Sequence, residues 1–592
     1  MKIRIISLLI VLVMILSCFA GCSLIGGKDN TPDDDNTDTD DGGNNDLDGP
    51  PQIGGGGEDE GDWWENIAYD ETNLKFMMTL CSNNEELSSG CERYLAGTGD
   101  EVVGENIDDL VAERNDNAYE LTKVNVTYDY YDDNAELYGF SKMFDVIETE
   151  CTTPDRETPD MYCNWMTDLL ICSLKGCFAN LYSKTHGEGD FKGDNHFNLK
   201  NEGYMSDLMG SLTLSTSKIY VVASDYFIDL IRAFFVVPVN VKLFNEIAPT
   251  MYPDIDNPTI DDFFKEVKPC DCTNEDSESR CDEDCADGGW TYARLMEFSN
   301  AIYQDSDSDD TESINDRLGF ALGHNGLPAA GLIYTSSVTV IHKDWNETEK
   351  KYNYYYPQEN EELYNLFSAI SGMMGEEGVH FVTEGDANKL TFEGKKTPLL
   401  AVRNQFTSDK LLFGGIILVG SLEYETYQDM KTSTRGGFGV VPVPVYRAGD
   451  DYLTQIHVVG RAGAIRESST KFVQCSAFLH YQSSNSLDIK NEYYDYTLVE
   501  SAAGGDNSVE GNVDMLKYIR QNVRTSFDKL FEDAVGFMFK EVYKDSVKER
   551  FHNILCDEGY VYDGIETEYK RLVDVKTTSL QTLENDYSKL PS

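Results

Sequence analysis

From Leu74 onwards, short apolar segments alternate with stretches of helical periodicity, and this alternation limits the fold more than any other feature of the sequence. The pattern predicts strands at 74–79, 124–128, 159–163, 218–223, 317–322 and 397–402. Residues 234–239 form a further apolar run, and the proline-containing segment 437–445 is either a strand or a loop. It predicts helices at 106–120, 135–149, 166–181, 291–303, 361–374, 471–482, 513–522, 526–542 and 565–585. Strands alternating with helices of this length indicate βαβ units and an α/β fold with mainly parallel sheets.

The N-terminus has the pattern of an export signal. Lys2 and Arg4 precede the apolar run 5–16, which is shorter than the roughly 20 residues that a membrane-spanning helix needs. The segment FAGC that ends at Cys22 resembles the lipobox of bacterial lipoproteins. We therefore expect 1–21 to be a signal peptide and Cys22 to be lipidated, which places the protein on the extracellular face of the cell membrane. The alternatives are an ordinary signal peptide, or lipidation at Cys18.

The next segment, 22–62, has the composition of a disordered tether. Between Lys28 and Asp62 it contains thirteen acidic residues and one lysine, with almost nothing apolar to bury. The whole chain carries a formal net charge of −57. Nucleic acids and anionic lipids need a positive surface, so neither is expected as a partner, and membrane contact is expected through the lipid anchor only.

Twelve cysteines follow Cys22. Cys270, Cys272, Cys281 and Cys285 lie in an acidic insert at 269–289, without the C-x-x-C spacing of a zinc site, so we favour two local disulfides over a metal. Cys163, Cys172 and Cys177 stand in apolar surroundings and are expected in the core. No bound metal or cofactor is predicted.

Several motifs in order resemble the extracellular solute-binding lipoproteins (family 1, carbohydrate-type) of bacterial ABC importers. They are LKFMMT, AERNDNAYELTKVNVTYDYY, TPDMYCNWMTDLL, SKIYVVASDY and AFFVVPVNVKLFNEI, followed by GGWTYARLMEFSNAIY, LTFEGKKTPLLAVRNQF and GGFGVVPVPVY. The likeness covers most of 65–480. The Cys-rich insert, the insert between Cys81 and Cys91, and the helical C-terminal region depart from that family.

The resemblance implies a two-lobed, periplasmic-binding-protein-like clamshell with crossing hinge strands and a helical C-terminal region. We expect lobe 1 at 63–235 with a return segment at 396–465, and lobe 2 at 236–395 with 466–592. The implied function is capture of a solute, most simply a mono- or oligosaccharide, by a monomer that delivers it to ABC permease subunits. Such proteins do no chemistry.

Ligands of open parallel sheets lie beyond the carboxyl ends of the strands, and polar or aromatic residues follow four of the predicted strands. The candidate ligand-binding residues are Asn164, Trp165, Asp168, Asp225, Tyr226, His324, Asn325, Arg403 and Asn404. Flat aromatic faces together with Asp, Asn and Arg suit a sugar. Two alternatives stay open: Trp165 as a core residue, and Asp225 paired with Arg403 as a structural ion pair. Trp290 is expected to be structural, beside Thr291 as a helix N-cap.

Enzyme motifs are not evident. The chain contains no G-x-S-x-G, H-E-x-x-H or P-loop sequence. With 105 acidic residues, a pair of carboxylates for glycoside hydrolysis would always be available, so that signal is uninformative. The alternative function is a secreted carbohydrate-active enzyme or a glycan-binding surface lipoprotein that takes no part in transport.

Overall fold

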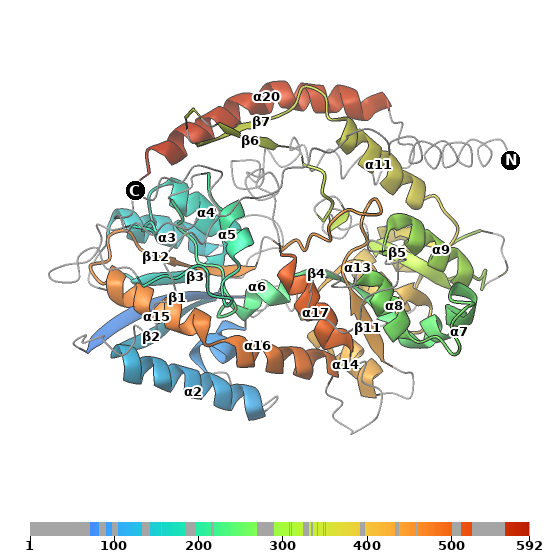
Figure 1. Ribbon diagram of the computed structural model, residues 1–592, viewed down its shortest axis with the longest axis horizontal. Helices are drawn as coiled ribbons and strands as arrows, with labels where there is room; N and C mark the ends of the chain where they lie inside the picture. The colour runs from blue at the N-terminus through green and yellow to red at the C-terminus, as the bar shows by residue number, and fades with distance from the viewer. Residues whose placement is uncertain are drawn as a thin grey trace, which may run out of the picture. The chain divides into compact units, whose positions relative to one another are not determined.

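A computed structural model describes residues 71–81, 90–97, 105–132, 142–154, 157–183, 196–214, 218–268, 289–306, 308, 311–323, 331–332, 335–339, 341–346, 348–349, 351–390, 397–432, 437–457, 460–499, 511–523 and 563–590. Within these residues the strands form two main sheets and a separate two-stranded hairpin (Figure 1). We call the part built on the sheet of β1 the first lobe, and the part built on the sheet of β5 the second lobe. The signal segment, Cys22, the acidic tether and the Cys-rich insert lie outside the described residues.

The first sheet has β1 (Thr72–Leu80) at its centre. Strands β2 (Val124–Asp132) and β3 (Met161–Trp165) flank it, and both run parallel to it, with Phe76 in register with each neighbour. Beyond β3 lies β12 (Arg461–Ile465), which is antiparallel. The last strand of this sheet therefore comes from a segment about 300 residues further along the chain.

The second sheet repeats this order. Its strands are β4 (Phe235–Asn240), β5 (Leu318–Gly323), β8 (Val379–Val382), β9 (Leu411–Phe413), β10 (Ile417–Leu418) and β11 (Phe438–Val441). Central β5 is parallel to β8 and β9, and β4 lies antiparallel beyond β9. In both sheets the central strand has a parallel neighbour on each side. In both, an antiparallel strand lies beyond one of these neighbours: β12 beyond β3, and β4 beyond β9.

The antiparallel strands stand where the chain passes between the sheets. β4 begins three residues after the end of α6 (Ile228–Arg232) in the first lobe, and β12 follows the end of the second lobe's sheet. The two crossings lie side by side, because Phe234 forms a bridge with Ile456 and the His457 amide donates to the Ala233 carbonyl at 2.9 Å. The expected α/β fold of two lobes joined by crossing strands is confirmed.

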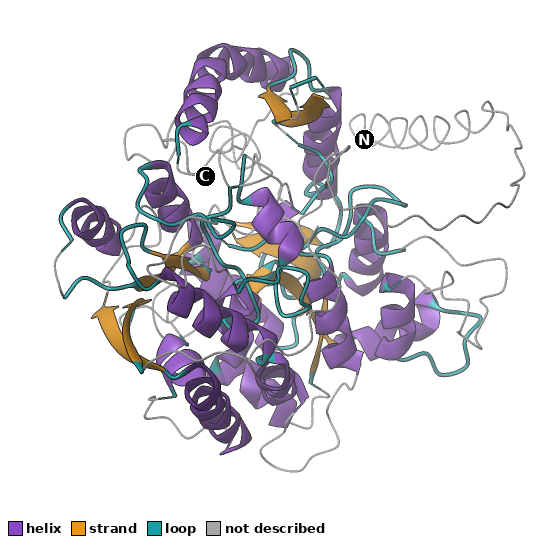
Figure 2. Cartoon of the chain, turned by 60° about the vertical axis from the view of Figure 1, so that its left-hand side comes forward, coloured by secondary structure: helices purple, strands orange, loops and turns teal. Residues whose placement is uncertain are grey.

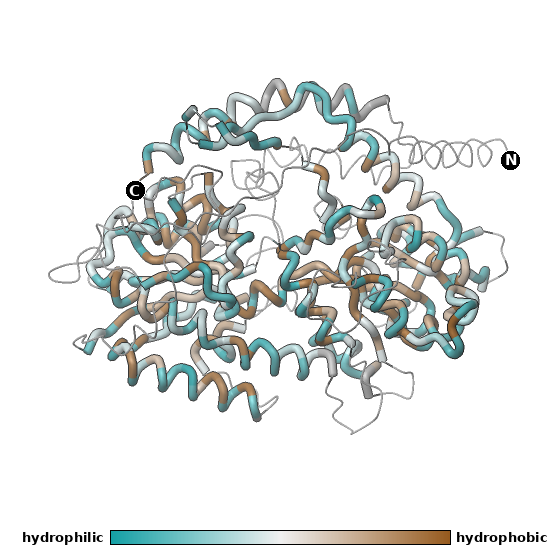
Figure 3. Tube along the Cα trace, in the orientation of Figure 1, coloured by the Kyte–Doolittle hydropathy of each residue, from teal (hydrophilic) through white to brown (hydrophobic). Residues whose placement is uncertain are grey.

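Helices enclose the strands on both faces (Figure 2), and apolar residues gather inside each lobe (Figure 3). The helical segments of the first lobe and of the crossings are η3 (Cys91–Ala96), α2 (Glu105–Thr122), α3 (Lys142–Thr152), α4 (Met166–Leu174), α5 (Ser206–Ser211), α15 (Phe472–Ser484), α16 (Leu487–Tyr494) and η6 (Asp495–Val499). Those of the second lobe are α7 (Val241–Met251), α8 (Ile260–Val267), α9 (Tyr292–Ile302), α11 (Glu361–Met373), α12 (Glu384–Lys389), α13 (Pro398–Thr407), η5 (Val419–Glu423), α14 (Glu425–Thr432) and α17 (Gly511–Gln521). The hairpin β6 (His342–Asn346)–β7 (Lys351–Tyr355) and the C-terminal α20 (Asp563–Ser588) complete the described elements. Among the described helices, none is both long and apolar enough to cross a membrane.

The start of α9 behaves as its sequence predicts. Thr291 is the N-cap, and its hydroxyl accepts a hydrogen bond from the Arg294 amide at 3.2 Å. Trp290 is fully buried, its ring packs against Phe263 and Phe413, and its indole N–H donates to the Pro442 carbonyl at 2.8 Å. The structural role predicted for Trp290 is therefore confirmed.

Two predicted strands are wrong. Residues 218–223 form no strand, and only Val222 makes an isolated bridge, with Gly463. Residues 397–402 begin helix α13 instead, because the Thr397 hydroxyl accepts a hydrogen bond from the Leu400 amide and Pro398 occupies the first helical turn. A threonine cap followed by proline is a helix-start signal, and here it decides the conformation of an otherwise apolar run. The candidate residues Arg403 and Asn404 consequently lie within a helix.

The lobe boundaries also differ from those expected. The segment 396–465 was expected to return to the first lobe, yet β9, β10 and β11 all belong to the second sheet and only β12 joins the first. Conversely, α15 packs against α2 in the first lobe, although 466–592 was assigned to the second. Contacts between residues far apart in the sequence decide both lobe assignments, and a local sequence pattern does not predict such contacts.

The cysteines predicted in the core can be located in the structure. Cys163, Cys172 and Cys177 are buried, as expected for core residues. Cys91 lies with its sulfur 3.6 Å from that of Cys163, in a contact between η3 and β3. The four cysteines predicted to form disulfides in the acidic insert are outside the described residues.

Candidate functional site

Three of the predicted ligand residues lie together at the end of β3, and all are buried. The Asn164 amide donates to the Asp168 carboxylate at 3.0 Å, and its carbonyl oxygen accepts from the Thr79 hydroxyl at 2.6 Å. These bonds join β1, β3 and the first turn of α4 inside the first lobe. Asn164 and Asp168 thus hold the end of the sheet in place.

Trp165 is the N-cap residue of α4 and only 1% of its surface is exposed. Its backbone pairs with Arg461 in β12. The indole N–H meets no acceptor among the described residues. This burial favours the core alternative for Trp165, while ligand contact stays a prediction.

Asp225 and Tyr226 also lie in the interior. The Asp225 carboxylate is 1% exposed and binds Lys490 at 2.6 Å and Arg520 at 3.0 Å. The Tyr226 ring is fully buried beneath the guanidinium of Arg114, 4.8 Å from the ring centre. Asp225 therefore links α16 to the last turn of α17, where a basic side chain is favourable.

The expected alternative pairing of Asp225 with Arg403 is not the one found. Arg403 is half-buried on α13 in the second lobe, with its guanidinium 4.5 Å from the centre of the Tyr424 ring. Asn404 is half-buried beside it. His324 and Asn325 are outside the described residues. The candidate residues that are described thus divide between the two lobes, and direct contacts do not bring the two groups together.

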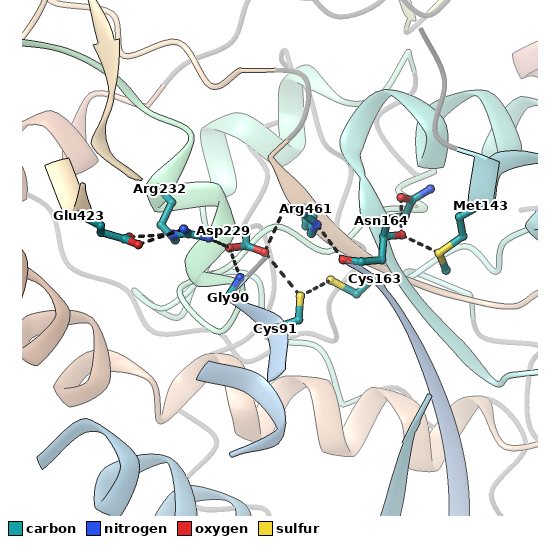
Figure 4. A network of polar contacts seen from close by, with 10 residues as sticks. Gly90, Cys91, Met143, Cys163, Asn164, Asp229, Arg232, Glu423 and Arg461 are labelled. Carbon is teal, nitrogen blue, oxygen red and sulfur yellow. Dashed lines mark hydrogen bonds and ion pairs between the residues drawn. The ribbon is translucent and has the colours of Figure 1, made fainter. Parts of the chain in front are cut away.

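A buried charge network that the sequence analysis missed lies at the crossings (Figure 4). The Asp229 carboxylate binds Arg232 at 2.7 Å and Arg461 at 3.4 Å, and it accepts a hydrogen bond from the Gly90 amide at 2.9 Å. Arg232 also binds Glu423 at 2.8 Å. Glu423 belongs to the second lobe and Arg461 opens β12 of the first, so the network spans both crossings.

The electrostatics of the network favour the ionised carboxylate. Burial would raise the pKa of Asp229, but Arg461, Arg232 and the Gly90 amide outweigh it, and the pKa is lowered. A sequence signal for this site did exist. Asp229 and Arg232 stand three residues apart within an apolar run, and charges in such a run are rarely buried unless they are paired.

Two buried histidines make the stability of this region depend on pH. Burial lowers the pKa of His457 to about 4, and burial with the nearby His196 lowers that of His480 to about 4. In the unfolded chain both titrate near 6.5, so between pH 6.5 and 4 the unfolded state binds more protons. The free energy of unfolding should therefore fall as the pH decreases through this window.

We expect each histidine to remove about 1 to 2 kcal/mol of stability between pH 7 and pH 5. Urea denaturation at several pH values measures this change in the free energy of unfolding. His457→Gln, which removes one titrating group, should reduce the slope of stability against pH by about half. A slope unchanged in that variant would contradict the assignment.

One hollow of about 300 Å³ lies between α16 and α17. It is lined by Glu202, Leu487, Lys490, Asn491, Tyr494, Lys517, Arg520 and Gln521. Lys490 and Arg520 on its wall both bind the Asp225 carboxylate, which offsets one of their two positive charges. Within the described residues, no group of three or more His, Cys, Asp or Glu side chains is placed to hold a metal.

The sheet topology instead marks an edge in each lobe where a ligand would bind. Parallel strands present ligands at their carboxyl ends, which are Leu80 and Asp132 in the first lobe and Gly323 in the second. The segments that follow these ends, 82–89, 133–141 and 324–330, lie outside the described residues.

The chain was compared with known proteins, and several solved structures align with most of it. No protein-family model and no curated protein sequence matches the chain. The sugar-binding protein MalE of Xanthomonas citri has 11% identity and a TM-score of 0.49, covering 87% of this chain and 99% of its own. A family 1 extracellular solute-binding protein of Alicyclobacillus acidocaldarius has 9% identity and a TM-score of 0.46, covering 88% and 100%.

A third similar structure is the galacto-N-biose/lacto-N-biose I-binding protein of an ABC transporter of Bifidobacterium longum, with 12% identity and a TM-score of 0.45 over 89% of this chain and 100% of that protein. At these identities and scores, the likeness does not decide what this chain binds.

Proposed function

We propose that this protein is the substrate-binding lipoprotein of an ABC importer, which captures an extracellular solute between its two lobes and delivers it to a membrane permease. The observation that carries the proposal is the repeated sheet order. Each lobe has a central strand, two parallel neighbours and an antiparallel strand beside a crossing. Two such lobes, joined where the crossings lie side by side, can rotate about that junction and close on a ligand.

The carbohydrate class of the solute rests on the sequence motifs that resemble carbohydrate-type binding proteins. The proposed chemistry is binding without catalysis. Edges of two α/β sheets facing a shared ligand would present aromatic faces and amide or carboxylate groups, which suit a sugar. We further propose that the mature chain is a monomer tethered through lipidated Cys22, which keeps the binding lobes beside the membrane that holds the permease.

A thermal-shift screen against monosaccharides, oligosaccharides and peptides tests the solute class. A binding sugar should raise the melting temperature, and at a concentration 100 times its Kd the stabilisation should be about 2.7 kcal/mol. Small-angle scattering of the saturated protein should then give a smaller radius of gyration. Stabilisation by peptides alone would contradict the carbohydrate class, and tight binding with an unchanged scattering curve would contradict lobe closure.

Two further measurements separate the proposal from its alternatives. Chromatography of the incubated oligosaccharide should show it intact, whereas shorter products would indicate an enzyme. The Cys22→Ala variant should appear in the growth medium instead of the membrane fraction, and retention with membranes would contradict lipid anchoring.

A further inference from the structure

The C-terminal helix α20 has anchors in both lobes. It is 26 residues long, which corresponds to about 39 Å. Its buried residues recur at helical spacing and form one stripe: Tyr569, Val573, Leu580, Leu583 and Tyr587. Figure 1 shows α20 running with the β6–β7 hairpin past both sheets, away from the crossings at β4. A stripe of this length packs along the helix instead of at one end.

The end of the helix beyond Tyr587 is held by the first lobe. The Tyr587 hydroxyl donates to the Lys218 carbonyl at 2.7 Å and lies 2.6 Å from the Thr213 hydroxyl, and its ring meets Tyr220 edge to face at 6.0 Å. The Lys218 ammonium donates to the carbonyls of Ser588 and Leu590, which caps the helix C-terminus. Residues 219 and 222 bond to the first lobe's core and to β12.

The other end is held by the second lobe. The Tyr569 hydroxyl donates to the Pro357 carbonyl at 3.0 Å, and the Tyr569 ring meets Tyr364 of α11 edge to face at 5.8 Å. Helix α11 packs on α9, which packs on β5 of the second sheet. One turn before Tyr587, the Tyr354 amide of β7 donates to the Glu584 carboxylate at 3.4 Å.

Because a helix is stiff, α20 cannot follow both lobes when they separate. Tyr569 and Tyr587 are 18 residues apart, about 27 Å along the axis, and this span sets the separation of the two anchors. Helix α11 and the Pro357 carbonyl hold the helix at Tyr569, and the first lobe holds it at Tyr587 and just beyond. One of these two attachments must therefore break when the lobes separate.

We infer that α20 is a strap that ties the two lobes together away from the crossings, and that one of its two anchors is released when the lobes open. A two-lobed binding protein with crossings alone is restrained at one junction, whereas this chain has a second restraint. The strap makes the ligand-free protein favour the closed arrangement. This inference concerns the motion of the lobes and does not depend on which solute binds.

Pulsed electron spin resonance on the ligand-free full-length protein tests the strap. Labels carried by unnatural amino acids at the exposed positions Asn117 of α2 and Asn245 of α7 would report the distance between the lobes. We expect a narrow distribution for the unaltered chain. Tyr587→Phe removes the hydroxyl contacts but keeps the ring, and should raise the ratio of open to closed molecules roughly tenfold.

Tyr587→Ala should shift the distribution further, because the ring packing on Tyr220 is lost as well. Thr582→Ala, on an exposed position of the same helix, is the matched control and should leave the distribution unchanged. If Tyr587→Ala does not fold, Tyr587→Phe decides by itself. A distribution in Tyr587→Phe that matches the unaltered protein overturns the strap, and an equal shift in Thr582→Ala does so too.

Discussion

Asp229→Ala should lower the free energy of unfolding by about 3 to 5 kcal/mol. The side chain is 4% exposed and is bound by Arg232 and Arg461, with the Gly90 amide as a third partner. Removing the carboxylate leaves Arg461, which is 2% exposed, with its charge uncompensated at that position. Urea denaturation at pH 7 measures the loss.

A matched control for this prediction is Glu148→Ala. Glu148 pairs with Lys175 on the surface, where both partners are about 40% exposed, so its removal should cost less than about 1 kcal/mol. The double variant Asp229→Ala/Arg461→Met removes both buried charges and should recover part of the lost stability. A loss below about 1 kcal/mol in Asp229→Ala would show that the network contributes little to the junction.

Trp165→Ala should also destabilise the protein strongly, by about 3 to 5 kcal/mol, because it leaves a large cavity under the end of β3. Trp345, half-buried on β6, is the control: Trp345→Ala should cost much less. Thermal and urea unfolding of both variants make the comparison. A ligand role for Trp165 would give a different outcome. Trp165→Ala would then weaken the binding of an identified sugar roughly tenfold or more and leave the melting temperature almost unchanged.

Secondary structure was largely predictable because most of it is a local matter. The apolar segments of β1, β3, β4 and β5 and the capped start of α9 carry their own signals. The wrong prediction at 397–402 has a local cause as well, because the Thr-Pro start of α13 precedes an apolar run that resembles a strand. Boundaries between the lobes were less predictable, since they follow from which strands pair.

The candidate ligand residues show the same limit. Position at a strand end selected Asn164, Trp165 and Asp225, but it does not report exposure, and all three are buried in the structure. The partners of Asp225 are more than 260 residues away in the chain, at Lys490 and Arg520. The Asp229 network depends on the same kind of distant contact, with Arg461 and Glu423.

What the sequence by itself determined is the alternation of strands and helices, and with it an α/β fold, because residue periodicity sets which faces can be buried. Only the tertiary structure decided that β12 completes the first sheet, that β9 to β11 belong to the second, and that α20 contacts both lobes. Those outcomes depend on pairings across hundreds of residues. Local propensity does not predict such pairings, because their free energy arises when distant apolar surfaces and charges are buried against each other.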